Sequence, residues 1–227
     1  MAWAFLDCVW LTGTDSADSS DSITIPSGAT YAVAFAVGYT GSGITMSALT
    51  VDSQTPDTVI HNIADGVEGD SSLYVAEFSG FTTGASKTVA WTWSATPVDG
   101  GVIGIAFFSD AELGNYGREL FASASNTASI DLTVSAGEGA FIFGASYDQD
   151  VNAAPTSSDQ TEDSNVGPIN GEYGAFGYEN TLDTPTTNMA CTGDFLVAFA
   201  FAIATPAGGG GATVPLFTNH YAKQRNR

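Results

Sequence analysis

Four short apolar segments constrain this chain more than any other feature. They cover residues 194–205 (DFLVAFAFAIAT), 29–37 (ATYAVAFAV), 102–108 (VIGIAFF) and 139–147 (GAFIFGASY). Apolar residues fill every second or nearly every position and are mixed with Ala and Gly. These runs are too short for membrane-spanning helices, and their β-branched and aromatic residues favour buried strands. We therefore expect them to be central strands of packed sheets.

Shorter alternating segments lie between these runs and are bounded by turn-forming residues. They cover residues 22–25, 44–51, 58–63, 73–78 and 87–93. Turns that recur roughly every ten residues are typical of an antiparallel β-sandwich or jelly roll. Residues 109–121 are the exception, because they start like a capped helix but contain Gly114 and Gly117. We expect a turn or one short helical piece there.

The chain also repeats itself. Residues 22–39 resemble residues 129–147, and residues 87–108 loosely resemble residues 186–202, an offset of roughly 100 residues. The repeat fits one sandwich made of two similar halves or two small sandwiches in series. We favour one, because no Pro- or Ser-rich linker separates the halves.

The predicted organisation follows from this repeat. An all-β, antiparallel β-sandwich or jelly-roll-like domain covers residues 1–206, with halves at about 1–108 and 122–206. A Gly tether and a basic, aromatic tail follow at 207–227, and we expect this tail to be flexible. Residues 148–165 form the longest irregular segment, which we expect to be a functional or mobile loop.

The charge of the chain is strongly acidic. It has 25 acidic and 5 basic residues, and three of the basic ones are Lys223, Arg225 and Arg227. Residues 1–222 therefore carry 2 − 25 = −23. Such a body repels nucleic acid and anionic membranes, so we exclude both as partners. The first residues lack the pattern of a signal peptide, and we expect synthesis in the cytoplasm.

Metal and cofactor motifs are absent from the sequence. The histidines are His61 and His220, with no zinc-ligand spacing and no strained Gly-x-Ser-x-Gly turn. The acidic stretch at 12–22 lacks the Gly and Glu of a calcium loop, so a solvated loop is favoured. Cys8 and Cys191 are interpreted as buried thiols, although pairing of their strands stays an alternative. No catalytic, cofactor-binding or metal residue is predicted.

Two kinds of saccharide site are compatible with the sequence. Glu77, Glu172 and Glu179 lie near aromatic residues, and two close carboxylates would permit a polysaccharide-degrading enzyme. Structural carboxylates on a wet face are the favoured interpretation. A glycan-binding platform would use Tyr173, Phe176 and Tyr178 beside the 148–165 loop. Trp91 and Trp93 share one strand face, which fits such a platform but fits a core layer better.

The tail peptide joins apolar and cationic side chains after the tether. Its predicted partner-docking residues are Leu216, Phe217, His220, Tyr221, Lys223, Arg225 and Arg227. With its Gly/Ala/Val/Phe strands and the segment VPLFTNHY at 214–221 after the Gly tether, the chain resembles small all-β structural proteins of tailed bacteriophage virions. The resemblance implies a non-enzymatic decoration, head- or tail-associated protein.

The same resemblance implies where such a protein acts and with what. It would be made in the host cytoplasm, become part of the virion, and contact other virion subunits and copies of itself. The alternative is a β-sandwich that binds glycan on a host surface. The second alternative is the polysaccharide-degrading enzyme.

Overall fold

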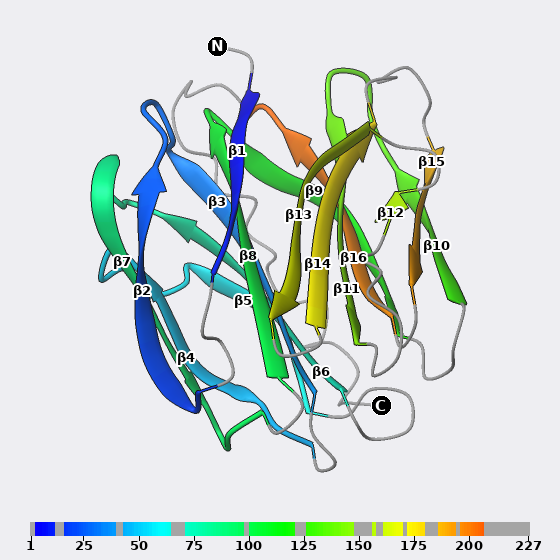
Figure 1. Cartoon of the computed structure of the whole chain (residues 1–227). Helices are drawn as coiled ribbons and strands as arrows, with labels where there is room; N and C mark the ends of the chain where they lie inside the picture. The colour runs from blue at the N-terminus through cyan, green and yellow to red at the C-terminus, as the bar shows by residue number, and fades with distance from the viewer. Residues whose placement is uncertain are drawn as a thin grey trace, which may run out of the picture.

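The computed structural model describes residues 3–11, 16–39, 43–64, 71–97, 100–120, 126–147, 156–157, 161–169, 172–179, 186–193 and 196–206. The regular structure in these ranges consists of strands β1 to β16, and every strand pairing is antiparallel. The predicted all-β, antiparallel class is confirmed. Figure 1 shows four layers, from β2, β7 and β4 on the left to β10, β15 and β12 on the right.

The first half of the chain forms two sheets. The first inner sheet has the order β1 (Ala4–Trp10), β8 (Gly100–Ser109), β3 (Tyr31–Tyr39), β6 (Ser71–Ser79) and β5 (Thr58–Ile63). The first outer sheet has the order β2 (Asp18–Ile25), β7 (Gly84–Trp93) and β4 (Met46–Val51).

The second half forms two sheets of the same sizes. The second inner sheet has the order β13 (Thr161–Ile169), β14 (Glu172–Glu179), β11 (Gly139–Tyr147), β16 (Val197–Ala204) and β9 (Glu112–Leu120). The second outer sheet has the order β10 (Asn126–Thr133), β15 (Thr186–Gly193) and β12 (Thr156–Ser157).

The two halves have one topology. Each strand of the first half has a counterpart eight strands later, so that β1 corresponds to β9 and β8 to β16. With this replacement the strand order of the first inner sheet becomes that of the second inner sheet, and the same holds for the two outer sheets. In each half the first strand pairs with the last, the second with the seventh and the third with the sixth. This wrapping is that of a jelly roll. The two similar halves predicted from the sequence repeat are confirmed. Each half is itself a sandwich of one inner and one outer sheet, so the structure has two packed sandwiches where the sequence favoured one.

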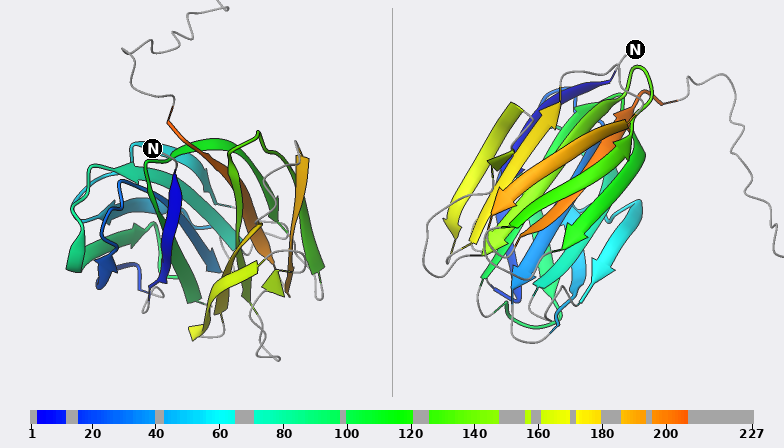
Figure 2. Two further views of the ribbon diagram at one scale, coloured as in Figure 1. Left: turned by 90° about the horizontal axis from the view of Figure 1, so that it is seen from above. Right: turned by 90° about the vertical axis from the view of Figure 1, so that its right-hand side faces the viewer.

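Each half has its own core, and a third core joins the halves. Phe78 and Trp91 lie in the core between the first inner and outer sheets, and Ile130 and Ile142 in the corresponding core of the second half. The third core lies between the two inner sheets. The outer sheets therefore form opposite sides of the molecule (Figure 2). The third core explains why no linker separates the halves.

The four apolar segments are the interior strands β3, β8, β11 and β16, as expected for central strands. Both faces of an inner sheet are covered, so nearly every position must be apolar. In β3, Val33, Phe35 and Val37 face the other inner sheet, whereas the alternate alanines face the outer sheet. The larger side chains thus fill the space between the halves.

The outer strands alternate as the sequence predicts. Val89, Trp91 and Trp93 of β7 lie in the first core, and the two indoles are only 1% and 2% exposed. This confirms the core interpretation of Trp91 and Trp93. It removes them from any saccharide platform.

The centre of the third core is a ring stack between the halves. Phe35 and Phe143 are each the fifth residue of the middle strand of their inner sheet. Their centroids lie 5.1 Å apart and their planes differ by 1°. Equivalent residues of the two halves therefore meet, as at the interface of a two-fold dimer.

Trp10 at the end of β1, and Trp3 just before its start, close one lateral edge of this core. Trp10 lies over Gly104 and Gly174, where an added Cβ would come within 3.0 Å of the indole. Trp3 donates a hydrogen bond from Nε1 to the Gly137 carbonyl oxygen, 2.7 Å away. Two residues of the first half thus contact the second half directly, and glycine is needed beneath Trp10.

The prediction for residues 109–121 was wrong. Residues 112–120 form the edge strand β9, paired with β16. Gly117, interpreted as a helix breaker, allows close packing instead, because a Cβ there would lie 2.6 Å from Ile130 Cγ2. Tertiary pairing with an apolar neighbour strand overrides the weak helix signal.

Two predicted loops also contain strands. Asp18 and Asp21 lie in β2 and pair with β7, so the acidic stretch at 12–22 is a loop only in part. Within residues 148–165, Thr156–Ser157 is β12 and β13 starts at Thr161, while 148–155 and 158–160 lie outside the described residues. Polar edge strands lack the apolar alternation that reveals a strand in a sequence.

We expect the two halves to unfold together, because the third core buries phenylalanine rings of both halves against one another. Phe143→Ala removes a fully buried ring at its centre and should lower the free energy of unfolding by about 3–5 kcal/mol. Urea denaturation should show one transition. Ser47→Ala, at an exposed position, should change stability by less than about 0.5 kcal/mol. Two separate transitions in the unmutated protein would contradict this account.

Candidate functional site

The predicted docking residues of the tail, Leu216 to Arg227, lie outside the described residues, as does the whole of 207–227. The described chain ends at Pro206, two residues after β16. The tail remains a prediction from the sequence.

The predicted glycan platform is not formed. Phe176 is fully buried between the inner sheets, and Tyr173 is 4% exposed. Tyr178 is partly buried and packs against Phe5, with ring centroids 6.1 Å apart. The Gly/aromatic pattern of β14 that indicated a platform is instead the pattern of a strand buried on both faces.

The three candidate carboxylates are not brought together. Glu172 and Glu179 are the two ends of β14, about 23 Å apart along an extended strand. Glu77 lies on β6 of the other inner sheet, where burial raises its pKa and the charge of nearby Asp57 adds to the rise. Glu172 is fully buried at the interface. The pKa of Tyr39 is raised first by the burial of Tyr39 itself and then by the negative charge of Glu172. Glu172 and Glu179 therefore do not have the spacing of a glycosidase pair.

The described part of the chain contains neither a cluster of metal-binding side chains nor a disulfide between its two cysteines. No group of three or more His, Cys, Asp or Glu residues there is arranged to hold a metal ion. Cys8 packs in the third core and Cys191 in the core of the second half. The strand pairing that would have joined them does not occur, and both are buried thiols. Within the described ranges, no helix is long and apolar enough to cross a membrane.

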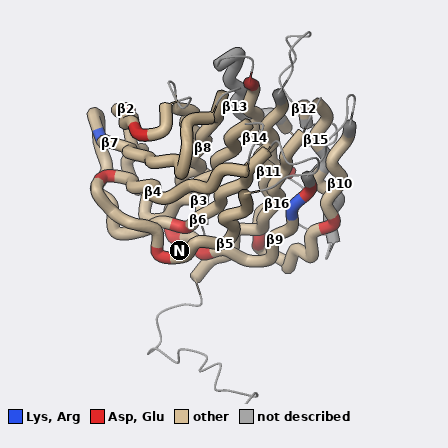
Figure 3. The backbone as a smooth tube through the Cα atoms, turned by 90° about the horizontal axis from the view of Figure 1, so that it is seen from below, with Lys and Arg blue, Asp and Glu red and all other residues tan. Residues whose placement is uncertain are grey.

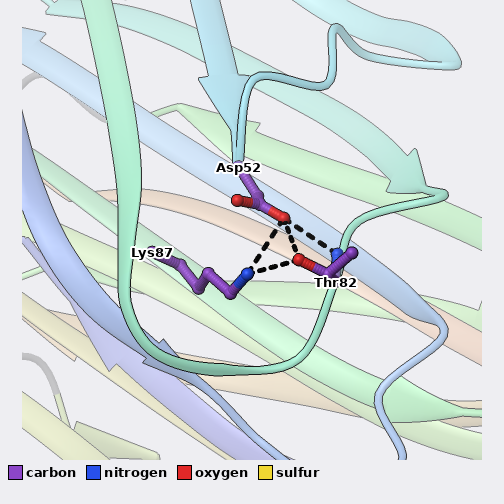
Figure 4. A network of polar contacts seen from close by, with 3 residues as sticks. All are labelled: Asp52, Thr82 and Lys87. Atoms are coloured by element: carbon purple, nitrogen blue, oxygen red, sulfur yellow. Dashed lines mark hydrogen bonds and ion pairs between the residues drawn. The ribbon is translucent and has the colours of Figure 1, made fainter.

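Lys87, one of the two cations before the tail, is engaged in a loop contact. Its Nζ lies 3.5 Å from Asp52 Oδ2 and also donates to Thr82 Oγ1 (Figure 4). Thr82 donates to Asp52 from both its hydroxyl (2.6 Å) and its backbone N–H (2.9 Å). These bonds, then the charge of Lys87, lower the pKa of Asp52. The network joins the turns after β4 and β6.

The other cation, Arg118, lies on the edge strand β9 and is exposed. Figure 3 shows the two cations far apart on the body. Among the described residues, Arg118 forms no ion pair, whereas Lys87 does. Sequence reasoning overlooked Arg118 because its segment was interpreted as a turn or helix.

Tyr116, two residues before Arg118, is the most exposed aromatic side chain in the described part of the chain. It is 47% exposed, and the other large apolar residue that is exposed among those described is Val59. The Tyr116 ring lies against Phe199 (5.8 Å between centroids) and edge-on to His61 (5.7 Å). One side of the ring is thus fixed by packing while the rest faces solvent.

His61 on β5 connects the two inner sheets at this edge. Its ring contacts both Tyr116 and Phe199 of the second half. Burial and then the charge of Arg118 lower its pKa, so the ring is neutral near pH 7. Nε2 of His61 is buried and has no hydrogen-bond partner among the described residues. We call Tyr116, Arg118 and His61 the β5–β9 site.

The duplication explains why this edge differs from the opposite one. β9 is the counterpart of β1, and both pair with the last strand of their half. Matching the registers places Tyr116 where β1 has Cys8, and Arg118 where β1 has Trp10. The β1 edge is closed by tryptophan, whereas the β5–β9 edge carries a phenol and a cation.

Comparisons with known proteins give little further information. No family model and no curated protein matches the chain. A solved structure described as "Structure of the N-terminal CBM22-1-CBM22-2 tandem domain from Paenibacillus barcinonensis Xyn10C" matches 90% of this chain and 93% of that chain at 10% identity. The TM-score is 0.24, and a likeness at that level carries no argument about function.

The loop network around Asp52 predicts a pH dependence of stability. Because the pKa of Asp52 is lower in the folded protein than its usual value of 3.8, the carboxylate stabilises the fold above that value. This contribution disappears as the pH falls through the lowered pKa. Asp52→Asn should therefore reduce the urea midpoint at about pH 6 and have little effect at about pH 2.

Asp7→Asn, at an exposed position of β1, is the control for the loss of one negative charge. It should leave the urea midpoint nearly unchanged at about pH 6. An equal effect of both substitutions at that pH would show that net charge, and not the contacts with Thr82 and Lys87, is responsible.

Proposed function

We propose that the protein is a non-catalytic recognition module that binds a saccharide at the β5–β9 site. The observation that carries the proposal is the exposure of Tyr116 on a body whose other described large rings are mostly in cores. An exposed, immobilised aromatic ring offers an apolar face to the C–H groups of a sugar and a hydroxyl at its rim.

The neighbours of Tyr116 supply the polar contacts that such a ligand needs. Arg118 is exposed and has guanidinium N–H donors without an ion-pair partner among the described residues. Sugar hydroxyls both donate and accept, so they match these groups. Packing against Phe199 limits the movement of Tyr116 and lowers the entropy cost of binding.

A binding role fits the arrangement of the carboxylates better than a hydrolytic one. Glu172 and Glu179 stand at opposite ends of one strand, and Glu77 lies in the other inner sheet. Hydrolysis of a glycosidic bond needs two carboxyl groups on either side of it, about 5–9 Å apart. We therefore propose recognition without catalysis.

Tyr116→Ala should abolish saccharide binding, because it removes the apolar ring face. A panel of neutral and acidic mono- and oligosaccharides, followed by amide chemical shifts of labelled protein, would identify ligands and map them to the site. Loss of one stacking ring typically weakens binding at least tenfold, and Tyr116→Trp should retain it.

Val59→Ala is the matched control. Val59 is 49% exposed and lies on β5, opposite Ala76, which packs in the first core. Residues directly opposite each other point to the same face, so Val59 faces away from Tyr116. Its substitution should leave binding unchanged. If the ligand shifts residues elsewhere and Tyr116→Ala binds normally, the β5–β9 site is not the binding site.

An assembly role, as in a virion, is the second candidate. It is favoured by the contrast between a body of charge 2 − 25 = −23 in residues 1–222 and three cations among the last five residues. A tethered cationic peptide gains affinity for an acidic neighbouring subunit through its high effective concentration. The predicted partners are other subunits of the assembly and copies of the chain itself.

A variant ending at Ala207 tests this second candidate. It should stay folded, because every described strand lies before that residue. Light scattering should show larger species for the full chain and monomers for the shortened one. Identical monomers in both cases would rule out assembly through the tail of this chain alone, and unfolding of the shortened chain would contradict a tail that serves only as a tether.

A further inference from the structure

Building on the proposed function, we propose that the saccharide bound at the β5–β9 site carries a carboxylate and that Arg118 binds it. The ligand class is a sugar acid with an isolated carboxylate, such as a terminal uronic acid. Tyr116 contacts the sugar ring next to this carboxylate.

The availability of Arg118 is the first support. The chain contains 25 acidic residues, so a cation on its surface has many potential partners. Lys87 forms an ion pair with Asp52, with 3.5 Å between Nζ and Oδ2. Arg118 is exposed and forms no ion pair with any described residue. A guanidinium presents a planar pair of donors that matches a carboxylate in a two-bond contact.

The position of Arg118 is the second support. It lies two residues from Tyr116 on one edge strand, so the two side chains project from the same face of that strand. The counterpart of Arg118 in the first half is Trp10, which packs over Gly104 and Gly174 at its edge. The second half thus places a cation and an exposed ring where the first half has closed packing.

The charge of the whole body limits the ligand to an isolated carboxylate. At physiological salt, charges separated by more than about 8 Å are largely screened, so one carboxylate at Arg118 interacts mainly with its neighbours. A sulfated or polyuronate chain would extend over the acidic surface of the body, whose residues 1–222 carry 2 − 25 = −23, and would be repelled. Polyanions should therefore bind more weakly per sugar than a single terminal uronic acid.

The test compares two ligands that differ only at C6. Methyl β-D-glucuronide and methyl β-D-glucoside, with the corresponding galactosides, are titrated into the labelled full chain and followed by amide shifts of residues 112–120. The glucuronide or the galacturonide should bind about tenfold or more tightly than its neutral parent, the factor expected for one charge-assisted contact.

Substitutions separate the two groups. In Arg118→Gln the preference for the acidic sugar should vanish while weak binding of the neutral sugar persists. In Tyr116→Ala both should be lost. Lys87→Gln removes the other body cation and should leave the preference unchanged. Arg118 and Tyr116 lie at exposed positions, so the variants should fold, which thermal unfolding verifies.

The outcomes distinguish the inference from the proposed function. Equal binding of acidic and neutral sugars, or an unchanged preference in Arg118→Gln, would overturn the role of Arg118 and leave saccharide binding intact. Binding of acetate or a peptide carboxylate as tightly as the uronides would overturn the sugar as ligand. Tighter binding of polygalacturonate per sugar would overturn the limit set by charge. No shift with any sugar would refute both proposals.

Discussion

The packing of two five-stranded sheets against each other determines most of this molecule. Sheets in contact lie about 10 Å apart, and that space must be filled by side chains. In β16, Val197, Phe199 and Phe201 fill it, while Ala198 and Ala200 face the outer sheet. The same division occurs in β3. Each inner strand thus places its bulk toward the other half, and neither half alone could cover this face.

This packing leaves few rings for the surface. The rings of both halves lie within 4.7–6.5 Å of their neighbours in a continuous aromatic layer, from Trp3 and Phe5 to Phe201. Burying one such ring contributes roughly 2–3 kcal/mol, so selection for stability keeps rings inside. Tyr116 departs from this rule because it lies on an edge strand at the rim of the layer. An exposed ring at a rim costs little stability and remains available for contacts.

The sequence predicts the strands correctly where the apolar pattern is strong, and it fails where that pattern is weak. The runs of β3, β8, β11 and β16 have apolar residues on both faces, so they were predicted as central strands correctly. β9 contains Gly114 and Gly117 and reads as a turn, because its pairing with β16 depends on a partner distant in sequence. Because β9 was not predicted as a strand, its residues Tyr116 and Arg118 were not predicted as site residues. Exposure of Tyr116 and isolation of Arg118 depend on tertiary position, although the scarcity of cations was a signal that could have drawn attention to Arg118.

The duplicated fold also explains how the β5–β9 site arises. Two equivalent halves packed face to face create two equivalent edges, one at β1 with β13 and one at β9 with β5. Identical edges would be either both closed or both open. At β1, Trp10 lies over Gly104 and Gly174 and closes the edge. At β9, Tyr116 and Arg118 occupy the positions equivalent to Cys8 and Trp10. Divergence at these two positions is enough to turn a structural edge into a chemically distinct one, and it gives each chain one such edge.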